Sequence, residues 1–346
     1  MKFNRFLLIL SLLFIVAMAI GSVAASEDNN MTGDSSILEV SEASDLDDSQ
    51  LNSISDEPLM SQSQTIFVDE EGDSHNEMND HTIRNAINSA NDGDTIVING
   101  QDYVHVHVVI DKNLTIKSNV GTRLSSCSST AQSGHQGIFY LTSKASGTVI
   151  EGFNFNNDDG VLMDDDGYAI LVNGASDVAL RNCNMTTDGV GDAIRLENTK
   201  STVISNMSIN KVGNGIKIKN SEDIIIRDSN VSNCRFGIYV EDSSNVKIIS
   251  DNIDSNKIAG IAISGTSKNS TIIYNNITNN AAGVNLTASD HIYILGNHLA
   301  FNTYGVYVNC NVTKIEIRGN FFDQTKMYEL VRDMLERLGE LAQLLD

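Results

Sequence analysis

A short unit of alternating apolar and polar residues recurs along the C-terminal two thirds of the chain. Each unit opens on glycine or alanine followed by Ile or Val, continues as a strand with apolar residues two apart, and passes a polar turn into a second such strand. The units start at Gly137, Ala169, Ala193, Gly215, Gly237, Gly260, Gly283 and Gly305. The last five steps are 22, 22, 23, 23 and 22 residues, whereas the earlier steps of 32 and 24 residues indicate insertions.

A unit of this length cannot bury its own apolar face, so copies must stack on one another. Stacking pairs each strand with its copy in the next coil and produces parallel sheets, with about 4.8 Å between coils. Leucine-rich and helical repeats are excluded, because the units lack a Leu-rich consensus and alternate with a period of two. We therefore predict an all-β fold, a right-handed parallel β-helix (solenoid) with short capping helices, over residues 65–323.

Asparagine shares a register among these units. Residues at one position, 15 or 16 after each unit start, are Asn184, Ser208, Asn230, Asn252, Asn276, His298 and Asn320. Asn tolerates the left-handed conformation of a sharp turn, and stacked Asn side chains can hydrogen-bond from coil to coil. We predict a buried asparagine ladder here, and we expect Asn252→Leu to destabilise the protein strongly.

The cysteines do not share a register. Cys183, Cys234 and Cys310 lie 14, 19 and 5 residues after their unit starts, and Cys127 precedes the first unit. A disulfide between stacked coils needs matching positions, because the two Cα atoms must lie within about 7 Å. We expect small buried or turn residues rather than a set of disulfides.

Both ends of the β-helix carry helical patterns. Residues 65–118 fit a first coil with its cap, in which apolar residues of segment 81–90 lie on one helical face and cover the open end. Residues 324–346 form a C-terminal amphipathic helix with an apolar stripe, which includes Leu330, Met334 and Leu338. A cap on the last coil is favoured over an oligomerising coiled coil, because three heptads are short for the latter.

The N-terminal residues 1–25 have the pattern of a signal peptide. Lys2 and Arg5 precede a run of apolar residues, and small residues at 23–25 provide a cleavage site; an uncleaved membrane anchor is the alternative. Residues 26–64 form a disordered acidic spacer rich in Ser and Asn, since such a composition buries too little apolar surface to fold. Whether residues 1–25 are a cleaved signal peptide or an uncleaved anchor, we expect the remaining chain to lie outside the cytoplasm.

The strong negative charge narrows the class of partner. The formal net charge of −22 excludes nucleic-acid binding by phosphate neutralisation. It favours cations such as calcium, or basic partners.

No catalytic residue is assigned, because the acidic side chains do not converge in the expected register. Glycoside hydrolysis needs two or three carboxylates on one face. Asp177 and Asp223 share a register two coils apart with Ser201 between them, and Arg181 and Arg227 are spaced in the same way without an acidic cluster for a lyase. Three further charged residues stack on successive coils as a surface charge ladder: Glu197, Lys219 and Glu241.

No metal or cofactor site is assigned either. The insertion before Ala169 holds five carboxylates, which suit either a solvated loop or calcium: Asp158, Asp159, Asp164, Asp165 and Asp166. The spacing matches no EF-hand loop. His105 and His107 share one face of a strand, with no third metal ligand evident.

The units resemble the right-handed β-helix repeats of carbohydrate-binding proteins and sugar hydrolases. Segment 83–116, with Asp92-Gly93-Asp94-Thr95-Ile96, is similar to the opening of adhesin-like surface proteins of methanogenic archaea. The resemblance covers residues 65–323 and implies an exported cell-surface or secreted, adhesin-like and non-catalytic protein, whose partner is a polysaccharide or cell-surface glycan. The alternatives are a polysaccharide lyase or glycoside hydrolase on the same scaffold, and a structural stalk or truncated piece of a larger adhesin.

Overall fold

The computed structural model describes residues 63–69, 80–104, 106–125, 137–156, 167–186, 189–309 and 311–323. The chain divides into two compact units, Met1–Leu59 and Met60–Asp346, and every described residue belongs to the second. The predicted signal peptide, nearly all of the predicted spacer and the predicted C-terminal helix lie outside the described residues.

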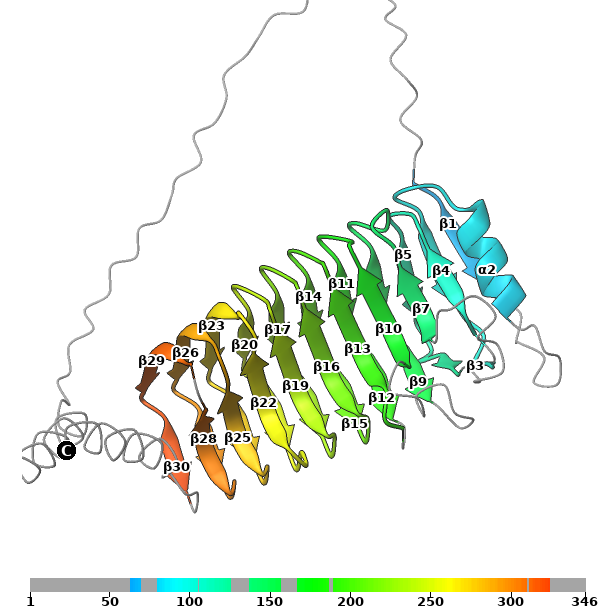
Figure 1. The fold of residues 1–346 in the computed structure, drawn as a ribbon. Coiled ribbons are helices and arrows are strands. Elements are labelled where there is room, and N and C mark those ends of the chain that lie inside the picture. Colours follow the sequence, from blue (N-terminus) through cyan, green and yellow to red (C-terminus); the bar gives the residue numbers. More distant parts are fainter. Residues whose placement is uncertain are drawn as a thin grey trace, which may run out of the picture. The chain divides into compact units, whose positions relative to one another are not determined.

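The described residues form a parallel β-helix of three sheets, which we call A, B and C (Figure 1). Each coil passes through a strand of sheet C, then one of sheet A, then one of sheet B, as in β10 (Tyr168–Asn173), β11 (Ala179–Arg181) and β12 (Asn184–Thr186). Every strand pairs in parallel with its counterpart in the neighbouring coil, so residues at equivalent positions stack. The predicted fold is therefore confirmed.

Within each sheet the strands pair in the order of the coils. Sheet A contains β1 (Thr65–Val68), β2 (Thr95–Ile98), β5 (Thr115–Ser118), β8 (Val149–Glu151), β11, β14 (Val203–Ser205), β17 (Ile225–Arg227), β20 (Lys247–Ile249), β23 (Lys268–Ile273), β26 (Asp290–Leu295) and β29 (Thr313–Arg318). Sheet B contains β3 (Asp102–Tyr103), β6 (Arg123–Leu124), β9 (Asn154–Asn156), β12, β15 (Ser208–Asn210), β18 (Asn230–Ser232), β21 (Asn252–Asp254), β24 (Asn276–Thr278), β27 (His298–Ala300) and β30 (Phe321–Asp323). Sheet C contains β4 (Val108–Ile110), β7 (Gly137–Leu141), β10, β13 (Asp192–Glu197), β16 (Asn214–Lys219), β19 (Phe236–Glu241), β22 (Ala259–Ser264), β25 (Ala282–Leu286) and β28 (Tyr304–Val308).

The alternation of the sequence becomes the inside and outside of each coil. In β16 the side chains of Ile216 and Ile218 are fully buried in the core, while Lys217 and Lys219 point outward. One continuous apolar core runs through the stacked coils. Burial at about 25 cal/mol per Å² of apolar surface makes this core the main source of stability.

An N-terminal helix, α2 (Asp80–Ser89), covers the first coil (Figure 1). Its Ile83 and Ile87 join the core, as the sequence predicted for a capping helix. The Lys112 ammonium group donates to the carbonyls of Ile87, Asn88 and Ala90 at 3.0, 2.8 and 2.8 Å. These bonds satisfy carbonyls that a helix C-terminus leaves without partners.

The predicted asparagine ladder has the wrong register. Six of its seven positions are the exposed first residues of sheet B strands: Asn184, Ser208, Asn230, Asn252, Asn276 and His298. Asn276 still donates to Asn252 Oδ1 at 2.7 Å, but on the outer surface. Asn252→Leu is therefore not expected to destabilise the protein strongly.

The buried ladder lies one residue earlier, at the turn from sheet A to sheet B. Asn275 Nδ2 donates to Asn297 Oδ1 at 3.0 Å, and Asn297 Nδ2 donates to Asn320 Oδ1 at 2.9 Å, so Asn320 alone of the predicted members belongs to it. The preceding residues, Tyr274 and Gly296, have φ values of 59° and 60°, and this left-handed turn points the following side chain inward.

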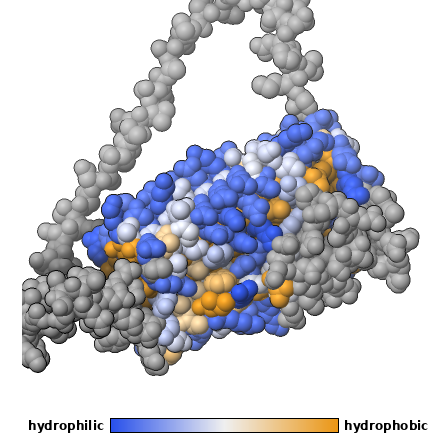
Figure 2. Space-filling model, in the orientation of Figure 1, coloured by the Kyte–Doolittle hydropathy of each residue, from blue (hydrophilic) through white to orange (hydrophobic). Residues whose placement is uncertain are grey.

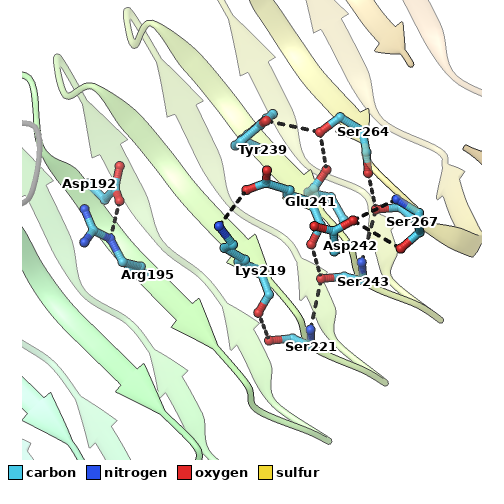
Figure 3. Close-up of polar contacts among 12 residues, drawn as sticks. Asp192, Arg195, Lys219, Ser221, Tyr239, Glu241, Asp242, Ser243, Ser264 and Ser267 are labelled. Carbon is cyan, nitrogen blue, oxygen red and sulfur yellow. Dashed lines mark hydrogen bonds and ion pairs between the residues drawn. The ribbon is translucent and has the colours of Figure 1, made fainter. Parts of the chain in front are cut away.

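The other two turns of the coil hold ladders that the sequence analysis missed. At the turn from sheet B to sheet C, Asn256 donates to Asn280 and Asn280 to Asn302 at 2.9 and 3.0 Å. At the turn from sheet C to sheet A, the amide of Ser221 donates to Ser243 Oγ at 3.0 Å, in a row of stacked hydroxyl groups that Figure 3 shows. The turns are thus tied from coil to coil by side chains as well as by strands.

Cys183 and Cys234 are buried free thiols at two different turns, as their different registers predicted. Burial raises the pKa of each thiol to about 11, so both are protonated at neutral pH. Cys127 and Cys310 lie outside the described residues.

Candidate functional site

The arginines that shared a register have ion-pair partners on or beside sheet A, and the aspartates occupy turns. Asp177 and Asp223 both have φ of 58° and occupy left-handed turns, with Ser201 at φ 54° in the coil between them. Arg181 pairs with Glu151 at 2.9 Å, and Arg227 pairs with Asp228 at 2.8 Å. These residues are not brought together into one site.

The predicted charge ladder is present at the last position of three sheet C strands. Glu197 pairs in register with Lys219, and Lys219 with Glu241. The Lys219 ammonium group lies 3.5 Å from Glu241 Oε2 (Figure 3). The pair is partly exposed, so it contributes about 0.2–1 kcal/mol to stability.

Two further rows of outward side chains run along sheet C from β13 to β28. The first row consists of Asp192, Asn214, Phe236, Ala259, Ala282 and Tyr304. The central row consists of Arg195, Lys217, Tyr239, Ala262, Asn285 and Tyr307. Because neighbouring coils lie about 4.8 Å apart, each row is a regular line of side chains along the helix axis.

In the middle of these rows, aromatic rings stand on either side of alanines. Ala259, Ala262 and Ala282 are only 0%, 4% and 6% exposed although they point away from the core, and they pack with aromatic neighbours. The rings of Phe236 and Tyr239 lie 5.2 Å apart on one side, and those of Tyr304 and Tyr307 lie 5.6 Å apart on the other.

We call these seven residues the aromatic–alanine face. The two ring pairs are three coils apart, or roughly 14 Å at the usual coil spacing. Figure 2 shows hydrophobic side chains gathered on part of this side of the molecule.

Asn285 adds a polar group beside the alanines. Its Oδ1 atom is buried and has no hydrogen-bond partner among the described residues. A buried acceptor left without a donor costs about 1–3 kcal/mol, so a ligand hydroxyl that donates here would recover this energy. Tyr239, nearby, is held in place because Ser264 Oγ donates to its hydroxyl at 3.1 Å (Figure 3).

A second cluster on sheet C is closed by its own partners. Asp192 is 1% exposed, accepts from Arg195 Nε at 2.5 Å and accepts from Asn214 Nδ2 at 2.6 Å. The Arg195 guanidinium also lies 5.7 Å from the ring centroid of Tyr168 (Figure 3 shows the ion pair). The carboxylate is thus fully occupied and serves as a structural ion pair.

Tyr168 fits this cluster because Gly137 leaves room for its ring. A Cβ atom on Gly137 would come within 1.9 Å of the ring of Tyr168. Burial raises the pKa of the Tyr168 phenol above its usual value, so the group stays neutral. Its hydroxyl is buried and has no partner among the described residues.

The stacked sheets and the repeat define the class of parallel β-helix repeat proteins. Residues 154–333 match the family described as "Periplasmic copper-binding protein (NosD)", and the chain belongs to this family. No curated protein matches the chain. Among the described residues, no helix is long and apolar enough to cross a membrane.

Solved structures share the fold. A 1,3-α-1,4-β-D-galactose-4-sulfate-3,6-anhydro-D-galactose-2-sulfate 4 galactohydrolase is similar with a TM-score of 0.53 and 10% identity, over 77% of this chain and 91% of that chain. The enzymatically active domain of tailspike protein 2 from bacteriophage CBA120 is similar with a TM-score of 0.50 and 13% identity, over 70% of this chain and 45% of that domain. At such identities the likeness concerns the fold alone.

The described His, Cys, Asp and Glu side chains form no cluster that would fit the copper of the family's name. Copper takes thiolate, thioether and imidazole ligands. The thiols of Cys183 and Cys234 are buried and protonated, and nowhere in the described ranges do three His, Cys, Asp or Glu side chains gather as a metal site would require. His107 contacts the carbonyl of Gly137, away from any such cluster. His105 and the acidic cluster within residues 158–166 lie outside the described ranges.

The aromatic–alanine face is the feature that the sequence analysis missed. Its signal is the residue type at the outward positions of sheet C, where Tyr239, Ala262 and Tyr307 fall in one register. The sequence analysis compared the registers of charged residues, which bear on catalysis, and of Asn, which bears on turns. Neither register reveals the aromatic–alanine face.

Proposed function

We propose that this chain is an exported, adhesin-like protein that binds a glycan on the aromatic–alanine face without cleaving it. The observation that carries the proposal is the placement of the ring pairs Phe236–Tyr239 and Tyr304–Tyr307 around buried alanines. Aromatic faces stack against the apolar C–H faces of sugar rings, and a few placed polar groups add direction. Asn285, with its unpartnered acceptor, is such a group.

The strands make this face rigid. Each ring projects from a strand paired on both sides or, for β28, stacked on β25, so little conformational entropy is lost on binding. A linear polysaccharide lying along the axis would meet equivalent positions at a constant interval of about 4.8 Å. A flat, repetitive surface therefore suits a repetitive ligand.

Export is supported by the family and by the sequence. The family is described as periplasmic, and residues 1–25 carry the pattern of a signal peptide. The solved structures that share the fold are named as a sulfated-galactan hydrolase and as the active domain of a phage tailspike. These names support a carbohydrate partner for this chain.

Binding without cleavage is favoured by the state of the carboxylates on sheet C. Hydrolysis requires two carboxyl groups, one of them a proton donor with a raised pKa. On the described part of this face, Asp192 is occupied by Arg195 and Asn214, and Glu241 is paired with Lys219. A lyase or hydrolase is the second possibility, and a stalk without ligand is the third.

A screen of the full chain against soluble polysaccharides separates the three. Affinity electrophoresis measures binding, and reducing-end release with ultraviolet absorbance measures hydrolysis and β-elimination, each with and without calcium. We expect retardation by at least one polysaccharide and no shortening of it. Released oligosaccharides would replace the proposal with an enzyme, and the absence of any retardation would favour a stalk.

A further inference from the structure

Three basic side chains border the aromatic part of the sheet C face. Lys217 precedes Tyr239 in the central row by one coil, and it is half-buried. Arg235 and Lys257 are exposed at the turns that lead into β19 and β22. The Arg235 guanidinium lies 5.8 Å from the ring centroid of Phe236, so this cation is placed directly beside the candidate stacking ring.

These three cations lack acidic partners in the described part of the protein. Neither Lys217 nor Lys257 makes a hydrogen bond or an ion pair with any described side chain, and Arg235 forms no ion pair with a described carboxylate. The other basic groups of sheet C do have partners, namely Arg195 with Asp192 and Lys219 with Glu241.

Nearby acids are already engaged. Asp254, three residues before Lys257, accepts from Thr278 Oγ1 and Asn279 Nδ2, both at 2.7 Å. Glu197 and Glu241 lie in the outermost row beside Lys219, away from Phe236. Unpaired positive charge therefore gathers on one side of the aromatic–alanine face.

The net charge of the whole chain does not oppose this. Residues 26–83 contain 16 Asp and Glu and no Lys or Arg, whereas residues 84–323 contain 18 Lys and Arg and 24 Asp and Glu. Most of the excess negative charge thus belongs to residues 26–83, which precede every strand of sheet C. At a Debye length of about 8 Å in physiological salt, local cations dominate recognition at close range.

We propose that the glycan bound on the aromatic–alanine face is anionic, with its carboxylate or sulfate groups paired to Lys217, Arg235 and Lys257. This inference rests on the proposed function. The rings hold the apolar faces of the sugars, and the cations select the acidic substituents. A neutral polysaccharide of the same backbone leaves the cations unpaired and binds more weakly.

The test compares matched polysaccharides that differ only in charge. Polygalacturonate is compared with its methyl ester, and dextran sulfate with dextran, so the two arms separate carboxylate from sulfate recognition. We expect the charged member of at least one pair to bind the full chain about tenfold more tightly, and salt raised from about 0.05 to 0.5 M to abolish the difference.

Charge variants locate the effect. Lys217→Gln, Arg235→Gln and Lys257→Gln are each expected to weaken binding of the charged polysaccharide about two- to fivefold, without weakening binding of its neutral form. Lys247→Gln is the matched control, because Lys247 is an exposed lysine of sheet A without an ion pair among the described residues. Its binding should equal that of the wild type.

The outcomes separate the two proposals. Equal binding of charged and neutral members, or equal effects of Lys217→Gln and Lys247→Gln, would overturn the anionic ligand and leave glycan binding intact. Absence of binding to either member of both pairs would overturn the anionic ligand. If no polysaccharide of the wider screen bound the chain either, glycan binding itself would be overturned.

Discussion

The backbone N–H of Asp251 donates to Asn275 Oδ1 at 2.8 Å, so an aspartate occupies the rung next to the buried asparagines. Asp251 is 1% exposed, and its Oδ1 accepts from the backbone N–H of Ser229 at 2.8 Å. Its Oδ2 has no partner among the described residues. In the next coil, Nδ2 of Asn275 donates to the carbonyl of Ile248 at 2.9 Å. Burial raises the pKa of the Asp251 carboxyl to about 7.

This carboxyl should make stability fall as pH rises. Between pH 4 and 7 the folded chain retains a proton that the unfolded chain has lost, so the free energy of unfolding decreases across this window. A shift from 3.8 to about 7 corresponds to a loss on the order of 4 kcal/mol. Urea unfolding at pH 5 and pH 8 should show the part of this loss that falls between pH 5 and 7, about 3 kcal/mol, in wild type and not in Asp251→Asn. Asp177→Asn, at an exposed turn, is the control, and parallel profiles for wild type and Asp251→Asn would refute the assignment.

The corrected register of the asparagine ladder predicts unequal effects of two similar substitutions. Asn297 is 1% exposed and bonds to Asn275, to Asn320 and to the carbonyl of Ile272. Asn297→Leu strands several buried polar groups and should cost about 3–5 kcal/mol. Asn252→Leu changes an exposed side chain and should cost less than about 1 kcal/mol. Urea midpoints measure both losses. Comparable losses would contradict the corrected register and favour a buried ladder at the position of Asn252.

The glycines that start four successive units allow neighbouring coils to approach, namely Gly215, Gly237, Gly260 and Gly283. A Cβ atom on Gly237 would lie 2.5 Å from the backbone oxygen of Gly260. Gly237→Ala should therefore destabilise by about 1–3 kcal/mol through overpacking. Gly93→Ala offers the comparison, because its Cβ meets nothing within 4 Å and only its φ of 88° opposes the change. A melting temperature of Gly237→Ala equal to that of wild type would show that the coils can separate without cost.

The buried thiols should resist modification. With pKa values of about 11 and little exposure, Cys183 and Cys234 carry almost no thiolate at pH 8. Treatment of the native chain with a thiol reagent, followed by peptide mapping, should leave both unlabelled until urea unfolds the protein. Rapid labelling of either in the native state would contradict the packing described for the turns.

The sequence predicted the fold because one physical constraint recurs in every unit. The alternation around Ile216 and Ile218 fixes which side chains face inward, and Gly237 marks the close approach of coils. The ladder was misplaced by one residue because register shows which positions stack but not whether they point inward. That direction depends on the left-handed residue before Asn297, and Gly296 and Tyr274 share no side-chain type that would reveal it.

The candidate site was less accessible to sequence reasoning. The sequence predicted the charge ladder of Glu197, Lys219 and Glu241, because residues spaced by one repeat occupy equivalent positions in successive coils. The aromatic–alanine face depends on Ala262 being small between larger neighbours, and a single small residue carries no signal in the sequence. Only the register between β19, β22, β25 and β28 shows that its neighbours are rings.

The central claim is that the aromatic–alanine face binds a glycan, and binding isotherms of three tyrosine variants test it most directly. Tyr239→Ala and Tyr307→Ala each remove a ring that packs with the alanines, whereas Tyr293→Ala removes a half-buried tyrosine of sheet A. On the polysaccharide retained most strongly by wild type, the first two should each weaken binding about tenfold, and the third should leave it unchanged, with similar melting temperatures for all three. Equal affinity of Tyr239→Ala, Tyr307→Ala and Tyr293→Ala would contradict the claim.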